Sequence, residues 1–120
     1  MTQPDTREGG RELVDADAAY LNRVIDFVEG KASAAGAEAH DKCALGRWYY
    51  ESGAERPRQA AHPKFPELGV VHMAFHLACD EAVRRKAAGE VEAARSALTR
   101  AAELAGQVRA ALAAVLASRG

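Results

Sequence analysis

The last third of the chain limits the fold more than any other segment. Apolar residues recur there at alternating spacings of three and four, at Val91, Ala94, Leu98, Ala101, Ala105, Val108, Leu112 and Val115. This repeat is typical of a helix that packs along the seam of a bundle or coiled coil. Many of the seam positions are alanine, so neighbouring helices can approach closely. The segment therefore predicts a long helix in an all-α fold.

Helical patterns also occur in three other segments, namely residues 11–30, 43–51 and 66–86. The first ten residues contain Pro4, Gly9 and Gly10 and are interpreted as a flexible N-terminal tail. We therefore expect a tail over residues 1–10 and a single helical domain over residues 11–120. The predicted architecture is a four-helix bundle with a short extra helix that carries Cys43.

Charge and hydropathy exclude several classes of function. The 120 residues include 16 basic and 17 acidic side chains, for a net charge of -1, which gives no basic footprint for nucleic acid or an anionic membrane surface. The longest apolar stretches are far shorter than the ~20 residues that cross a bilayer. The N-terminus lacks the apolar stretch of a secretory signal, and two cysteines do not make a disulfide framework. The sequence predicts a cytoplasmic protein.

Two histidines and a cysteine are the first candidates for chemistry. His72 and His76 are four residues apart on a predicted helix, so both imidazoles project from the same side. Such a pair is half of a metal site, although histidines at helical spacing also occur by chance in structural roles. Cys43 adds a thiolate, and a thiolate with two imidazoles is a ligand combination that favours zinc.

Asp17 is the candidate for a fourth ligand. It lies in register with Leu13, Tyr20 and Val24 on the apolar face of the first predicted helix. Burial of an isolated carboxylate costs several kcal/mol, so an acid at a core position implies a cation, a hydrogen-bond network or a raised pKa. The pattern also allows a second interpretation, in which the helix is rotated by one position and Asp17 lies at its edge in water, like Asp15.

These residues carry a family resemblance. The stretch CALGRWYY, which starts at Cys43, and the HxxxH pair of His72 and His76 on a long helix resemble the chemoreceptor zinc-binding (CZB) domain. The resemblance extends over roughly residues 11 to 87. It implies zinc held by three histidines and one cysteine, of which Cys43, His72 and His76 match three. Aligning Tyr20-Leu-Asn-Arg with the family's aromatic-x-Asn-Arg stretch puts Asp17 where the first histidine is expected. The implied zinc ligands are therefore Asp17, Cys43, His72 and His76.

The remaining histidines and the second cysteine are weaker candidates for a functional role. His40 is interpreted as a solvent-exposed loop residue, with a hydrogen bond to a ligand as the alternative, and His62 lies in a proline-bounded loop. Cys79 follows His76 by three and is interpreted as a small buried residue. The alternative is a resolving thiol or substitute ligand when Cys43 is oxidised.

A closed site with four protein ligands indicates a sensory or structural role, and the sequence shows no catalytic base, nucleophile constellation or phosphate-binding loop. We therefore expect a non-enzymatic module. The resemblance implies that it responds to zinc availability or to oxidants such as hypochlorous acid through Cys43, in signal transduction or chemotaxis. It also implies a homodimer. Family members are usually attached to a chemoreceptor or diguanylate cyclase, and because this chain has no room for such a domain, we expect a stand-alone module with a separate signalling partner. The alternatives are a hemerythrin-like two-iron bundle and a metal-free interaction bundle.

Overall fold

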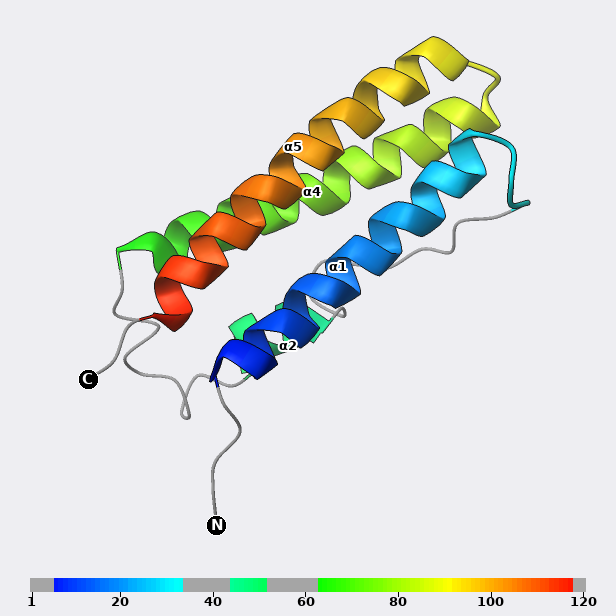
Figure 1. Ribbon diagram of the computed structural model, residues 1–120. Coiled ribbons are helices and arrows are strands. Elements are labelled where there is room, and N and C mark those ends of the chain that lie inside the picture. Colours follow the sequence, from blue (N-terminus) through cyan, green and yellow to red (C-terminus); the bar gives the residue numbers. More distant parts are fainter. Residues whose placement is uncertain (1–5, 34–43, 52–62, 118–120) are drawn as a thin grey trace.

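The protein is an all-α bundle, as the sequence predicts. The computed structural model describes residues 6–33, 44–51 and 63–117, and within these residues it contains no strand. The long helices lie side by side, and the short one contacts the first of them (Figure 1). They are α1 (Thr6–Val28), α2 (Ala44–Glu51), α4 (Lys64–Ala87) and α5 (Val91–Leu116). The short helix predicted over residues 43–51 corresponds to α2, which begins at Ala44, whereas Cys43 lies outside the described residues.

Two glycines end the helices and set the turns. Gly30 and Gly89 have φ angles of 80° and 81°, in the left-handed region that favours glycine. After α1, the amide of Lys31 donates to the carbonyl of Asp26 at 2.7 Å and that of Gly30 to Phe27 at 3.2 Å. This pair of hydrogen bonds is a Schellman motif, and the same pattern recurs at Gly89 after α4. The second turn joins α4 to α5 as an antiparallel hairpin (Figure 1).

Two helices begin earlier than the sequence indicates. Helix α1 starts at Thr6, five residues before the predicted position, and includes Gly9 and Gly10. A glycine in a helix costs only about 1 kcal/mol relative to alanine, so this pair does not stop the helix. Helix α4 starts at Lys64 and has Pro66 in its first turn. Proline is tolerated there because the first amides of a helix have no partner within the helix. The division into a tail and one domain stays a prediction.

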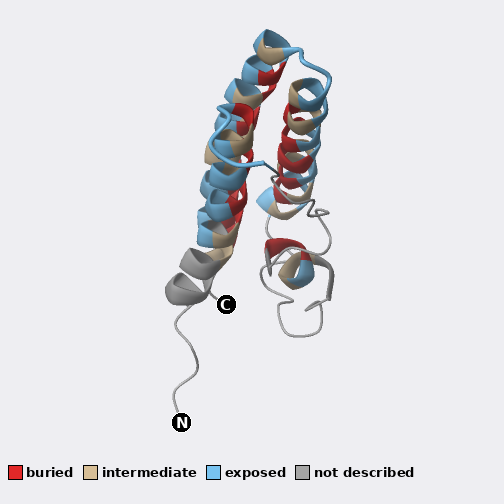
Figure 2. Ribbon diagram, turned by 90° about the vertical axis from the view of Figure 1, so that its right-hand side faces the viewer, coloured by how far each residue is buried: buried red, intermediate tan, exposed pale blue. Residues whose placement is uncertain are grey.

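The core lies between the three long helices. Figure 2 shows that the buried residues gather on the sides of the helices that face their neighbours. The most extensive contact joins α4 and α5. Four alanines of α5 are buried, namely Ala94, Ala97, Ala101 and Ala111. Ala94 and Ala101 belong to the predicted seam, whereas Ala97 and Ala111 lie beside it. The larger core side chains come mainly from the other helices, as with Tyr20, Val24 and Phe75.

Candidate metal centre

Asp17, His72 and His76 meet in the core between α1 and α4. The Nε2 atom of His72 lies 3.4 Å from Oδ2 of Asp17, and the Nε2 atom of His76 lies 3.7 Å from Oδ1. One candidate ligand atom from each of the three residues can be chosen so that all lie within 4.8 Å of one another. Asp17 and the buried Tyr20 are three residues apart on α1, so both side chains lie on the same, inward side of the helix. The cluster therefore joins two helices that are far apart in the sequence.

The three side chains are removed from solvent. Asp17 has 4% of its surface exposed and each histidine 2%, so the interpretation in which Asp17 lies at the helix edge is wrong. Among the described residues, no group donates a hydrogen bond to either carboxylate oxygen. Burial raises the pKa of the Asp17 carboxyl, but the imidazoles of His72 and His76 outweigh this and hold its pKa below the ordinary value. The two imidazoles thus favour the ionised form of this buried carboxylate.

Aromatic packing fixes the orientation of His76. Its ring stacks on that of Tyr20 from α1, with centroids 5.2 Å apart and planes at 19°. Phe75 and His72 contact it edge to face, with centroid distances of 5.2 and 4.7 Å. Rotation of the imidazole is restricted by these neighbours. The sequence indicated Tyr20 only as a core residue. Its spacing of three from Asp17 is the sequence signal that it also packs next to the cluster, where it stacks on His76.

The cluster fits zinc by both chemistry and distance. Carboxylate oxygen and imidazole nitrogen are common zinc ligands, at about 2.0–2.2 Å from the metal. A tetrahedron with such bonds has edges of roughly 3.3–3.6 Å. The 3.4 Å between His72 Nε2 and Asp17 Oδ2 falls in this range, and the 3.7 Å between His76 Nε2 and Asp17 Oδ1 is slightly longer. A bound divalent cation would also compensate the buried carboxylate. These three residues can hold a metal ion with little rearrangement.

Other candidate residues lie outside the described part of the chain. These are Cys43, His40 and His62, so the thiolate of the predicted ligand set is not placed. Helix α2 begins at the residue after Cys43, and its Leu45 is fully buried in the core. Trp48 packs against the same core. These two side chains therefore attach the short helix to the bundle.

Tyr49 of α2 makes a specific contact with the start of α4. Its hydroxyl donates a hydrogen bond to the carbonyl of Phe65 at 2.8 Å, and the two rings stack with centroids 4.2 Å apart. Gly69 leaves the space for this ring, because a Cβ atom there would lie 2.5 Å from the Tyr49 hydroxyl. The aromatic residues after Cys43 thus connect α2 to the helix that carries both histidines.

Cys79 is a buried thiol outside the cluster. Its side chain is fully buried, and it does not join the Asp17, His72 and His76 group. Burial, together with the negative charges of Asp80 and Asp17, raises the pKa of the thiol to about 12. The thiol therefore stays protonated near neutral pH. This confirms the interpretation of Cys79 as a small buried residue.

The fold and this cluster define a helical-bundle domain with a buried set of metal-ligand side chains. The sequence model of the chemoreceptor zinc-binding domain matches residues 18–83, more than half of the chain. The chain therefore belongs to this family, which consists of regulatory zinc-binding domains. The match includes Cys43, His72 and His76 and begins one residue after Asp17. No curated protein and no solved structure shows significant similarity to the chain.

Among residues 6–33, 44–51 and 63–117, no helix combines the length and the apolar character needed to span a bilayer.

Proposed function

We propose that the protein is a zinc-binding regulatory module whose metal is held by Asp17, Cys43, His72 and His76. The observation that supports this most is the buried Asp17 carboxylate, which accepts no hydrogen bond from the described residues and lies 3.4 Å from His72 Nε2. A carboxylate in such surroundings calls for a cation. Zinc would supply that positive charge and join the carboxylate to both imidazoles.

The fourth ligand is proposed to be Cys43. It is the one cysteine of the family's CxLGxW motif, and it directly precedes α2, whose Leu45 is buried in the core. Cys79 is a poor alternative because it does not belong to the group of close ligand atoms that Asp17, His72 and His76 form. Two anionic ligands would make the zinc centre formally neutral, whereas one cysteine with three histidines gives +1.

The proposed signal is zinc availability or an oxidant. A thiolate reacts with hypochlorous acid to give a sulfenic acid and chloride, in which sulfur loses two electrons and chlorine gains them. Oxidation of Cys43 would remove a ligand and weaken metal binding. Because Asp17 belongs to α1 and the two histidines to α4, loss of the metal would release a link between these helices. The proposed output is a bundle in which α1 and α4 are held together less firmly.

Delivery of that output requires a partner. We propose a homodimer in the cytoplasm that acts on a separate protein of the chemoreceptor or diguanylate cyclase type, in signal transduction such as chemotaxis. Three apolar side chains on the outer face of α4 support an interaction surface, namely Val70, Met73 and Leu77, with 68%, 40% and 60% of their surface exposed. Their spacing of three and four places them in one stripe.

Metal content tests the proposed site. The purified protein is expected to contain one zinc per chain by elemental mass spectrometry, and Asp17→Ala and Cys43→Ala are expected to lose most of it. Asp15→Ala serves as the matched control, because Asp15 is an exposed carboxylate on the same helix. A wild-type protein without zinc, or an Asp17→Ala variant that binds it unchanged, would reject the four-ligand site. Iron with a visible absorption band would instead favour the hemerythrin-like alternative.

A test of the oxidant response follows zinc release over time. Hypochlorous acid in stoichiometric amount is expected to release zinc from the wild type. In a Cys79→Ser variant the release is expected to proceed equally fast, because the buried, protonated Cys79 thiol takes no part. Release that depends on Cys79 would contradict the assignment of Cys43 as the sensing thiol.

A further inference from the structure

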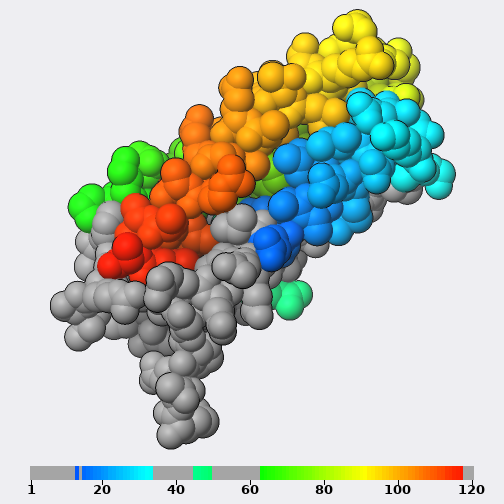
Figure 3. Space-filling view, in the orientation of Figure 1, coloured from blue at the N-terminus to red at the C-terminus, as the bar shows by residue number. Residues whose placement is uncertain are grey.

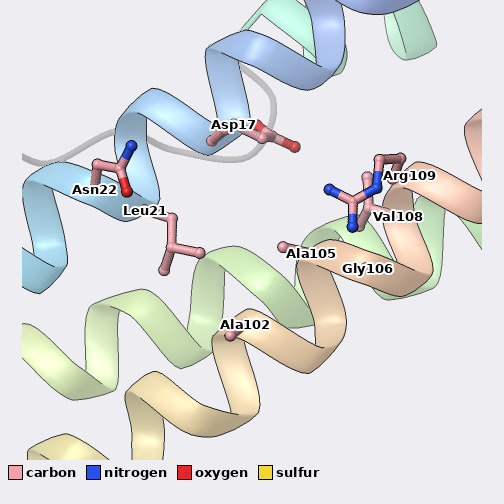
Figure 4. Close-up of a pocket in the computed structure, with 9 residues that line it drawn as sticks. Asp17, Leu21, Asn22, Ala102, Ala105, Gly106, Val108 and Arg109 are labelled. Carbon is pink, nitrogen blue, oxygen red and sulfur yellow. The ribbon is translucent and has the colours of Figure 1, made fainter.

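A hollow on the surface reaches the Asp17 side chain. It lies between α1 and α5, which Figure 3 shows as neighbours on one face of the molecule. Its volume is about 170 Å³, enough for several water molecules or a small organic group. Figure 4 shows Asp17 at one side of the hollow and the Arg109 guanidinium across from it. Much of the wall on the α5 side is small, with Ala102, Ala105 and Gly106.

Asp17 connects this hollow to the buried imidazoles. Asp17 forms part of the wall, and its carboxylate has the two Nε2 atoms of His72 and His76 at 3.4 and 3.7 Å. The Asp17 side chain has 6% of its surface exposed, and both of its carboxylate oxygens are buried. The buried rings of Tyr20 from α1 and Phe75 from α4 pack against His76. The hollow therefore ends at Asp17, whose carboxylate lies beside both imidazoles.

We propose that this hollow is the access route by which zinc, and the small chelating group that carries it, reach and leave the Asp17 end of the site. The inference rests on the proposed zinc site and adds to it how the metal exchanges. Zinc can expand from four to five ligands for a short time, so an incoming chelator oxygen can bind before a protein ligand departs. That oxygen must come within bonding distance of the metal, which the packed aromatic side of the cluster does not allow.

Two residues set the properties of the route. Gly106 keeps it open, because a glycine has no side chain to fill the space, and a Cβ atom there would meet only the Arg109 guanidinium, at 4.0 Å. Arg109 places a positive charge at the rim (Figure 4). A cation at the mouth of a cleft attracts anionic solutes and repels free Zn²⁺. The chemical class expected to use the route is thus a small carboxylate-bearing chelator rather than the bare metal ion.

The test measures zinc transfer rates in the full chain. Zinc-loaded protein is mixed with EDTA, which is anionic, or with 1,10-phenanthroline, which is uncharged, and release is followed by stopped flow at low salt. Gly106→Leu is expected to slow release to both chelators by about tenfold, since its side chain fills the hollow. Uptake of zinc from the metal–chelator complex is expected to slow by the same factor, so that affinity stays unchanged. Arg109→Gln is expected to slow release to EDTA by about threefold at low salt, an effect lost at high salt, and to leave phenanthroline unaffected.

Controls separate this inference from the zinc site itself. Ala110→Leu places the same leucine side chain at an exposed position of α5 that does not line the hollow, and is expected to exchange zinc at the wild-type rate. Gly106→Ala provides a milder filling variant whose fold is checked by circular dichroism. If Gly106→Leu and Gly106→Ala both load zinc and exchange it as fast as the wild type, the access route is refuted while the zinc site stands. If the wild type binds no zinc, the proposed function itself fails.

Discussion

Replacement of Asp17 by leucine is expected to have opposite effects on stability with and without zinc. The two side chains have nearly the same shape and number of heavy atoms, so leucine can occupy the position with little repacking. In the metal-free protein the substitution removes a buried carboxylate that accepts no hydrogen bond from the described residues. In the zinc-loaded protein it removes a proposed ligand. This one substitution therefore separates the loss of stability caused by the buried carboxylate from the contribution of Asp17 to zinc binding.

The expected magnitudes follow from the burial of Asp17. Exchange of a buried charged group for an apolar group of similar volume is often neutral or stabilising by about 1–4 kcal/mol. We expect a gain of about 1–2 kcal/mol in EDTA, because the two imidazoles that lower the pKa of Asp17 offset part of its burial cost. For a chain of this size, this corresponds to a rise in Tm of about 4–8 °C. In free zinc at 100 times the wild-type Kd, the wild type gains about 2.7 kcal/mol.

The variant is expected to gain much less from zinc. Loss of a direct ligand should weaken affinity by at least about 100-fold, which reduces the stabilisation at the same zinc concentration to about 0.4 kcal/mol. Asp17→Leu should therefore be more stable than the wild type in EDTA and less stable in zinc. Urea unfolding followed by circular dichroism in both buffers measures the two differences. Asp15→Leu is the matched control, and is expected to change stability by less than about 0.5 kcal/mol in either buffer.

Two results would refute this reasoning. A variant that is less stable than the wild type in EDTA would mean that the Asp17 carboxylate stabilises the metal-free bundle through the imidazoles. A variant that keeps the full zinc-dependent gain would mean that Asp17 is not a ligand.

Three further predictions concern residues around the site. Gly69→Ala places a Cβ atom 2.5 Å from the Tyr49 hydroxyl, and is expected to lower stability to urea by about 1–3 kcal/mol. Cys79 in a Cys43→Ser background is expected to react with a thiol reagent at pH 8 only on unfolding, because a pKa of about 12 leaves roughly one thiolate in ten thousand. Leu77→Glu, at a position 60% exposed, is expected to convert the proposed dimer to a folded monomer in sedimentation velocity.

Each of these predictions has its own check. In a Tyr49→Ala background the Gly69→Ala substitution should cost nothing, and an equal cost in both backgrounds would argue against the contact. Since the pKa of Cys79 in the folded protein lies above its ordinary value of 9.0, stability should fall as pH rises from about 9 towards 12. Rapid labelling of the native protein at pH 8 would contradict the burial of the thiol. A Leu77→Glu protein that sediments like the wild type would place the dimer contact elsewhere.

The helices could be predicted because their signals are local. The alternation of three and four in residues 91–115 depends only on the helical repeat, and most of the buried residues of α5 lie on it, namely Ala94, Ala101, Val108, Leu112 and Val115. The start of α1 could not be predicted in the same way. Gly9 and Gly10 have low helix propensity, but the helix runs through them. A local preference of about 1 kcal/mol per glycine does not decide where a helix begins when the rest of that helix packs against the bundle.

Part of the site was also accessible from the sequence. The spacing of His72 and His76 places two imidazoles on one side of a helix, and the register of Asp17 with Tyr20 and Val24 predicts an inward carboxylate. That these groups meet depends on how α1 packs against α4, which no spacing within one helix defines. The hollow beside Arg109 depends on the same packing between α1 and α5, and the sequence gives no signal for it.

The coordination shell of the zinc-loaded wild type tests the central claim most directly. X-ray absorption at the zinc edge is expected to show one sulfur at about 2.3 Å and three nitrogen or oxygen ligands at about 2.0–2.2 Å, with the imidazole scattering of two histidines. Loss of one oxygen or nitrogen ligand in Asp17→Ala, with the sulfur retained, would complete the assignment. A shell without sulfur, or one that is identical in the wild type and Asp17→Ala, would contradict a site formed by Asp17, Cys43, His72 and His76.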